Sequence, residues 1–281
     1  MNKKNGNRRR AGQIGLYGLL ALALLWTLVP IVWMVLSSFK SPDDLLATTP
    51  KVIFKPTFQH YQGLFTGANS LWSYIEHSLL AAGISTAIAV ALACLAGYGL
   101  SRSHFRGKQH LSFWIISTRM APIAAVIVPL YLIFRNLDLL DSVTGLIIAY
   151  LTFNLPFAIW LMNAFFADLP VSLEEAAMVD GATRFQAFWR VALPLVTPGI
   201  VTTAILCLIF SWNDYAFART FSGPESQTIP IAASQLITQQ GVDWGKLTAI
   251  GTVVVLPMVA VGLAVRRYLV RGLTLGAVKG E

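Results

Sequence analysis

Residues 78–100, SLLAAGISTAIAVALACLAGYGL, form a run without a single charged side chain. A helix needs about 20 predominantly apolar residues to cross the hydrocarbon core of a bilayer. Because backbone polar groups in lipid must be paired within the segment, this run is predicted to be a membrane-spanning helix. Its many Ala, Gly and Ser residues allow close approach of neighbouring helices, so the span is expected to pack against others.

Five more long apolar runs flank this one, and only Arg119 in the third and Asp214 in the fifth interrupt them with a charge. The composition agrees, with 56% hydrophobic and 12% charged residues, about half the charge of an ordinary soluble domain. We therefore predict an all-α integral membrane protein in which residues 1–281 form one transmembrane domain. The six predicted spans are residues 14–36, 78–100, 111–134, 142–167, 195–218 and 247–265.

The basic residues indicate how these spans are oriented. Fourteen Lys and Arg residues fall on the side of the N-terminus, six fall on the opposite side, and Arg119 lies within a span. Since Lys and Arg concentrate in cytoplasmic loops, both termini are predicted to be cytoplasmic. The net charge of +8 thus reflects topology, and the basic face of a nucleic-acid-binding protein is absent from the pattern. Cys94 and Cys207 lie in apolar runs, so neither a disulfide nor a metal site is expected.

The predicted cytoplasmic loop, residues 168–194, is too well organised to be a plain linker. Ser172 and Glu175 have the spacing of a capping box, which predicts a short helix starting at Leu173. Gly181 stands where a left-handed residue would end that helix. Residues 183–191, rich in aromatic side chains, favour a second helix along the membrane surface.

Two interpretations of this helix-turn-helix loop remain open on physical grounds. It could anchor as an amphipathic hairpin at the lipid headgroups. Alternatively, its short helix, with an acidic first turn and small side chains, could dock into a cleft of a cytoplasmic partner.

The same residues carry a resemblance. Glu175-Ala176-Ala177, three residues, Gly181, nine residues and Val191-Ala192-Leu193-Pro194 resemble the EAA motif of permease subunits of bacterial ATP-binding-cassette (ABC) importers. The family pattern is Glu-Ala-Ala, three residues, Gly, nine residues, Ile, any residue, Leu-Pro, and this chain departs only by Val191. Residues 271–280 and Trp212-Asn213-Asp214 resemble segments of carbohydrate permeases of the maltose-system type.

The resemblance implies an inner-membrane permease subunit of a bacterial carbohydrate importer. Its implied partners are a second permease subunit, an ABC ATPase dimer and an extracytoplasmic solute-binding protein. The chain itself would bind no cofactor and catalyse no reaction, with ATP and Mg on the partner ATPase; it contains no Gly-x-x-x-x-Gly-Lys-Ser/Thr sequence. The roles that the family assigns to its motif residues imply that the ATPase-coupling residues of this chain are Glu174, Glu175, Ala176, Ala177, Met178, Asp180, Gly181, Leu193 and Pro194. They also imply that the tail residues Thr274, Gly276 and Lys279 contact the ATPase.

Polar residues within the spans are candidates for the substrate pathway, because a charge at mid-bilayer costs roughly 2.5 to 3.5 kcal/mol. Counted along straight helices, Arg119 and Asp214 differ in depth by about 16 Å, so a direct ion pair is not expected. Amides and aromatic rings suit a carbohydrate, but they also join helices. The candidates are Asn154, Trp212, Asn213, Asp214 and Arg119.

A self-contained secondary transporter is the alternative function. It would usually show inverted repeats and ion-coupling charges within the spans, and no convincing repeat relates the two halves of this sequence. An intramembrane enzyme is disfavoured because no His-Glu-x-x-His or Gly-x-Ser-x-Gly sequence occurs. Both alternatives leave the organisation of residues 168–194 unexplained.

Overall fold

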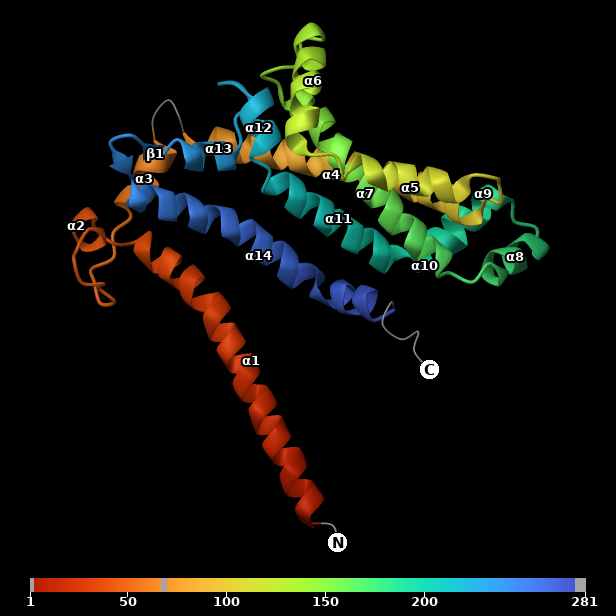
Figure 1. The fold of residues 1–281 in the computed structure, drawn as a ribbon, viewed down its shortest axis with the longest axis horizontal. Helices are drawn as coiled ribbons and strands as arrows, with labels where there is room; N and C mark the ends of the chain where they lie inside the picture. Colours follow the sequence, from red (N-terminus) through yellow and green to blue (C-terminus); the bar gives the residue numbers. More distant parts are fainter. Residues whose placement is uncertain (1–2, 67–69, 276–281) are drawn as a thin grey trace. The chain divides into compact units, whose positions relative to one another are not determined.

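The computed structural model describes the backbone of residues 3–66 and 70–275, and the side chains of residues 13, 15–66 and 70–264. The described chain is helical except for loops and one two-stranded hairpin (Figure 1), which confirms the all-α prediction. The chain separates into two units. The first combines residues 1–69 with 235–255, and the second combines residues 70–234 with the chain from 256 onward.

The first unit is organised around α1 and the beginning of α14. At Gly245 a Cβ atom would overlap the ring of His60, and at Gly251 it would meet the Met34 sulfur, so both glycines permit close helix packing. The buried ring of His60 also makes a 2.8 Å hydrogen bond with the Lys40 carbonyl. The elements are α1 (Lys3–Ser37), α2 (Pro42–Leu45), α3 (Gln59–Phe65), the antiparallel strands β1 (Ile237–Thr238) and β2 (Gly241–Val242), and the first part of α14 (Trp244–Leu275).

The second unit contains most of the helices and both hydrophobic clusters. Its elements are α4 (Leu71–Arg102), α5 (Lys108–Thr118), α6 (Ile123–Asn136), α7 (Val143–Ala167), α8 (Ser172–Val179), α9 (Arg184–Ala187), the π-helix η1 (Phe188–Ala192), α10 (Leu193–Leu195), α11 (Thr197–Trp212), α12 (Ala216–Phe221), α13 (Ile229–Ser234) and the end of α14.

Helix α4 packs along α7 and α11 through its small residues, as the sequence predicts. Ala82, Ser85, Ala89 and Ala93 are all fully buried, and their spacing of three to four residues places them on one side of the helix. At Gly97 a Cβ atom would lie only 2.8 Å from the backbone nitrogen of Asn163 on α7. The absence of a side chain there allows the two helices to touch.

The third predicted span is not one straight helix. The chain forms α5 and α6, which meet at an angle of 84° across a short break (Figure 1). Pro122 is the residue immediately before α6; it lacks an N–H group and disfavours helical geometry at Ala121, which explains the break. The predicted span over residues 111–134 is therefore interrupted beside Pro122, a residue whose missing N–H group predicts a bend there.

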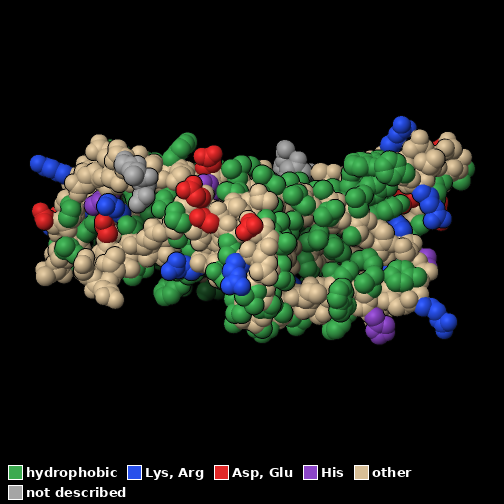
Figure 2. Space-filling view, turned by 90° about the horizontal axis from the view of Figure 1, so that it is seen from above, with side chains coloured by type: hydrophobic (Ala, Val, Ile, Leu, Met, Phe, Trp, Pro, Cys, Tyr) green, Lys and Arg blue, Asp and Glu red, His purple; other side chains and the backbone are tan. Residues whose placement is uncertain are grey.

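The fifth predicted span is also corrected. It begins at Thr197 after a 71° bend from the preceding helical segment, and α11 ends at Trp212 rather than at residue 218. Among the described residues, four helices are long and apolar enough to cross a membrane, and the number rises to six if each bent pair forms one span. Large hydrophobic side chains are exposed over much of the face drawn in Figure 2, a surface that suits lipid or other subunits.

Candidate functional site

The segment between α7 and α11 forms the predicted helix-turn-helix. Helix α8 begins at Ser172, and Gly181 adopts a φ of 94°, the left-handed conformation expected at its end. The capping box predicted at Ser172 and Glu175 is wrong, because Val171 precedes the helix and provides no side-chain cap. A capping box forms at the second helix instead, where Thr183 and Gln186 exchange hydrogen bonds of 2.8 and 3.2 Å.

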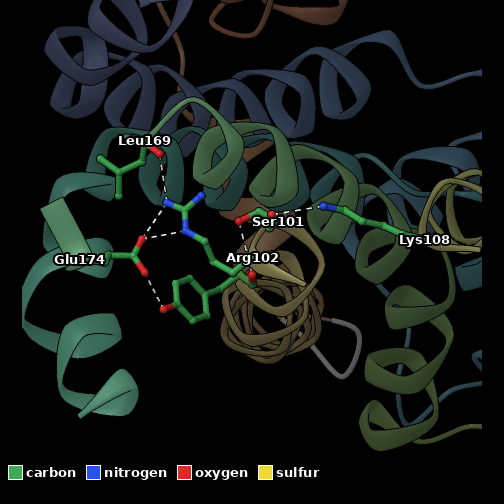
Figure 3. Close-up of polar contacts among 6 residues, drawn as sticks. Ser101, Arg102, Lys108, Leu169 and Glu174 are labelled. Carbon is green, nitrogen blue, oxygen red and sulfur yellow. Dashed lines mark hydrogen bonds and ion pairs between the residues drawn. The ribbon is translucent and has the colours of Figure 1, made fainter. Parts of the chain in front are cut away.

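Glu174 is the buried residue of α8, with 4% of its surface exposed. Figure 3 shows its carboxylate directed at Arg102, the last residue of α4. Arg102 donates from Nε to Glu174 Oε1 at 2.8 Å, and its Nη2 lies 2.7 Å from the same oxygen. Tyr98 donates its hydroxyl to Oε2 at 2.6 Å. Both carboxylate oxygens are thus occupied within the chain.

An aromatic cluster packs beside this carboxylate. The Tyr98 ring lies 4.7 Å from the Phe188 ring and 5.4 Å from the Phe166 ring, centroid to centroid. Phe166 belongs to α7 and Phe188 to η1, and both are buried. The rings fix the second helix of the loop against α4 and α7, so α8 extends from a well-packed base.

The rest of α8 is presented outward. Glu175, Ala176, Asp180 and Gly181 are exposed, whereas Ala177 and Met178 are half-buried. Beyond the motif, Leu193 is half-buried and Pro194 is exposed. Large apolar side chains accompany this surface, since Val179 is 87% and Phe185 68% exposed. A surface of this kind, with apolar and acidic groups on a short helix, is typical of a protein-binding site.

The tail residues predicted to contact an ATPase are mostly outside the described part. Thr274 lies within the backbone of α14, but its side chain is not described. Gly276 and Lys279 fall outside the described residues.

Arg119 and Asp214 line one cavity of about 270 Å³ in the second unit. No ion pair joins them in the described chain, as expected, but the depth argument fails because the chain turns sharply after Arg119. The Arg119 guanidinium lies 4.4 Å from the Phe157 ring centroid and 4.3 Å from that of Phe210. These two cation–π contacts stabilise the cation in the wall of the cavity.

Asp214 has a second, local contact. Its carboxylate accepts a 3.0 Å hydrogen bond from the backbone N–H of Ala218, so it caps the start of α12. The remaining wall of the cavity is aromatic and hydroxyl-bearing. It includes Thr118, Ala121, Ile123, Val126, Thr152, Phe153, Phe210 and Phe217.

The other three candidates do not line this cavity. Asn154 is fully buried and donates a 2.7 Å hydrogen bond to Ser211 Oγ, which joins α7 to α11. Trp212 is buried at the end of α11, and the exposed Asn213 bonds back to the Ile209 carbonyl. These contacts fit the packing role that sequence reasoning left open for amides and indoles.

Sequence reasoning missed the aromatic and threonine lining of the cavity. Phe153 is the residue before Asn154, so the two side chains leave α7 in different directions. The helical periodicity around Asn154 was therefore the signal that could have separated the cavity-lining residue from the buried one. It also treated Arg102 only as a charge that marks topology. No local pattern connects Arg102 with Glu174, which is 72 residues away.

Comparison with known proteins supplies the family. Residues 89–275 match the family described as binding-protein-dependent transport system inner membrane component. The chain is 37% identical over 262 residues to the trehalose transport system permease protein SugB of Mycobacterium tuberculosis, covering 92% of this chain and 95% of that protein. It is 33% identical over 255 residues to the diacetylchitobiose uptake system permease protein DasC of Streptomyces coelicolor, covering 89% and 91%.

A solved structure shares the fold. It is a chain of a bacterial ABC transporter involved in the import of the acidic polysaccharide alginate, with a TM-score of 0.76 and 26% identity, covering 92% of this chain and 96% of that one. The family match and these alignments together span nearly the whole sequence. The chain therefore belongs to the inner membrane components of binding-protein-dependent transport systems, and it is a non-catalytic permease subunit of an ABC importer.

Proposed function

We propose that this permease forms half of the translocation pathway of a carbohydrate importer in the bacterial inner membrane. One observation carries the proposal: relatives that align over about nine-tenths of the chain are permeases for trehalose and diacetylchitobiose. The alginate transporter, which resembles the chain over a similar length, also imports a carbohydrate. A sugar, a polyol or a sugar derivative is the proposed substrate class.

The proposed topology has six spans, with the bent α5–α6 pair and the bent segment leading into α11 each counted as one. Fourteen basic residues against six support cytoplasmic termini. Non-helical backbone at membrane depth is tolerated where protein covers it or where it lines a cavity. The break between α5 and α6 fits that rule, because Arg119 and Ala121 line the cavity. We treat the whole chain as one permease domain.

The proposed partners are a second permease subunit, an ABC ATPase dimer that carries ATP and Mg, and an extracytoplasmic solute-binding protein. The exposed surface of α8 and the turn at Gly181 support ATPase docking on the cytoplasmic side. Glu175, Ala176, Asp180 and Gly181 are its accessible residues. An anionic, small-residue helix of this kind can enter a cleft that carries complementary charge.

The proposed substrate pathway passes the cavity that holds Arg119 and Asp214. Aromatic rings and threonine hydroxyls around these charges provide the stacking faces and hydrogen-bond partners that a carbohydrate needs. Asn154, Trp212 and Asn213 would support the helices around the pathway.

Co-purification from the native membrane tests the proposal. We expect the tagged chain to bring down an ATPase and a second permease subunit. Gly181→Asp and Glu175→Lys should lose the ATPase, because the first places a side chain and a charge at a left-handed turn and the second reverses an exposed charge. Asp243→Asn, an exposed acidic residue of the first unit, serves as the control. Isolation of the chain alone, with the variants behaving like wild type, would favour a self-contained secondary transporter.

A further inference from the structure

We propose that Glu174 is a mechanical link rather than an ATPase contact, and that Tyr98, Arg102 and Glu174 together transmit the movement of α8 to the membrane helices. We call these three residues the Glu174 clamp. The inference deepens the proposed function, because it rests on α8 being the helix that the ATPase moves.

Glu174 is buried, and both oxygens of its carboxylate are engaged within the chain. Its side chain is 5% exposed, and that of Arg102 is 15% exposed. One carboxylate oxygen faces two nitrogens of Arg102, and the other accepts from Tyr98 (Figure 3). A partner could reach this carboxylate only after the clamp had opened.

Arg102 connects three elements through one rigid group. Besides Glu174 on α8, its Nη2 donates a 3.1 Å hydrogen bond to the carbonyl of Leu169, just after the end of α7. Arg102 itself ends α4. A guanidinium presents its donors in a fixed planar fork, so its two acceptors, the Glu174 carboxylate and the Leu169 carbonyl, cannot shift independently of each other. A displacement of α8 is therefore passed to the ends of α4 and α7 together.

The membrane helices that receive this movement are closely packed. Gly97 brings α4 against Met162 and Asn163 of α7 one turn and a half before Arg102. Tyr98 is the residue after Gly97, and its ring packs between α7 and η1 while its hydroxyl holds Glu174. Close packing transmits displacement with little slack, because dense interiors deform little.

Glu175 provides the contrast that makes the inference testable. It is the next residue along α8 and has the same chemistry, but it is exposed. Loss of Glu175 should weaken ATPase docking, whereas loss of Glu174 should leave docking intact and loosen α8 from α4.

The experiment measures the distance between α8 and α4 in the assembled transporter. Spin labels are placed at the exposed positions Val179 and Leu79, after both buried cysteines have been replaced by alanine. Pulsed electron paramagnetic resonance then gives the distance distribution with and without Mg-ATP plus vanadate. For the unmodified clamp we expect one narrow distribution under both conditions.

We expect Glu174→Gln and Arg102→Met to at least double the width of that distribution while ATPase recovery stays within twofold of wild type. Tyr98→Phe removes one hydrogen bond and should give an intermediate width, which keeps the test valid if a stronger variant fails to assemble. The charge-exchanged pair Arg102→Glu with Glu174→Arg should narrow the distribution again. Lys108→Met is the matched control, because Lys108 donates a 3.2 Å hydrogen bond to the Ser101 carbonyl and lies on the opposite side of Arg102 from Glu174 in Figure 3.

Unchanged widths in Tyr98→Phe, Glu174→Gln and Arg102→Met would overturn the inference, as would a wild-type distance that shifts when ATP is added. ATPase loss in Glu174→Gln as severe as in Glu175→Lys would place Glu174 in the docking surface instead. A Glu175→Lys variant that retains the ATPase contradicts the proposed docking function. The widths without nucleotide still report on the clamp in that case.

Discussion

At the scale of single residues, Arg119 distinguishes a pathway role from a packing role. Its guanidinium makes cation–π contacts with two phenylalanine rings and lines the cavity. Arg119→Met should lower sugar uptake at least tenfold relative to wild-type cells, because methionine offers the cavity no hydrogen-bond donor. ATPase co-purification should be unaffected.

Arg135→Met is the matched control, since Arg135 is exposed at the end of α6 and is absent from the cavity wall. Normal uptake by Arg119→Met would remove this cavity from the pathway. Sequence reasoning selected both residues as pathway candidates, Arg119 as a charge within a span and Asn154 as an amide that could pair with a sugar hydroxyl. Only the structure separates them: one side chain lines a cavity, and the other is fully buried against Ser211.

At the scale of helices, two glycines of α4 differ in how much space surrounds them: Gly97 lies against α7, and Gly99 does not. Gly97→Ala should destabilise the protein by about 1 to 3 kcal/mol, because the added methyl group meets α7 backbone and the helices must separate. Gly99→Ala should be neutral or stabilising by up to about 1 kcal/mol, since nothing lies within 4 Å of its Cβ position.

Thermal unfolding in detergent checks this pair of variants. The readout is the fraction of protein that stays soluble after heating. Equal melting temperatures for the two variants would show that α4 and α7 do not touch as closely as Gly97 indicates. The sequence predicted that α4 packs against other helices from its small residues. It could not identify Gly97 as the critical position, because that depends on the register of α7, which is set by tertiary contacts.

Helix existence and helix continuity were predictable to different degrees. Length and absence of charge sufficed for α1, α4, α7 and α14, and Gly181 marked the end of α8 correctly. Pro122 and Pro194 predict changes of direction before α6 and α11, but an apolar run does not report how large each bend is. Prolines such as Pro129 and Pro156 lie inside continuous helices, so a proline alone does not specify where a helix ends.

At the scale of the whole molecule, the proposed topology places residue 53 and residue 179 on opposite sides of the membrane. Both side chains are highly exposed, at 94% for Ile53 and 87% for Val179, so a cysteine at either position should be accessible from its own side. The native Cys94 and Cys207 are buried, and their replacement by alanine gives an unreactive background. In intact spheroplasts, a membrane-impermeant maleimide should label Ile53→Cys at once and Val179→Cys only after permeabilisation.

The labelling pattern depends on the number of spans between the two positions. Residue 53 follows α1, and α4, the α5–α6 pair and α7 separate it from residue 179. With α5 and α6 counted as one span, the chain crosses three times and the two sites face opposite compartments. If the bent pair instead enters and leaves on one side as a re-entrant loop, the chain crosses only twice, and both cysteines would be labelled from the same side. The experiment thus decides whether a helix pair bent by 84° spans the bilayer.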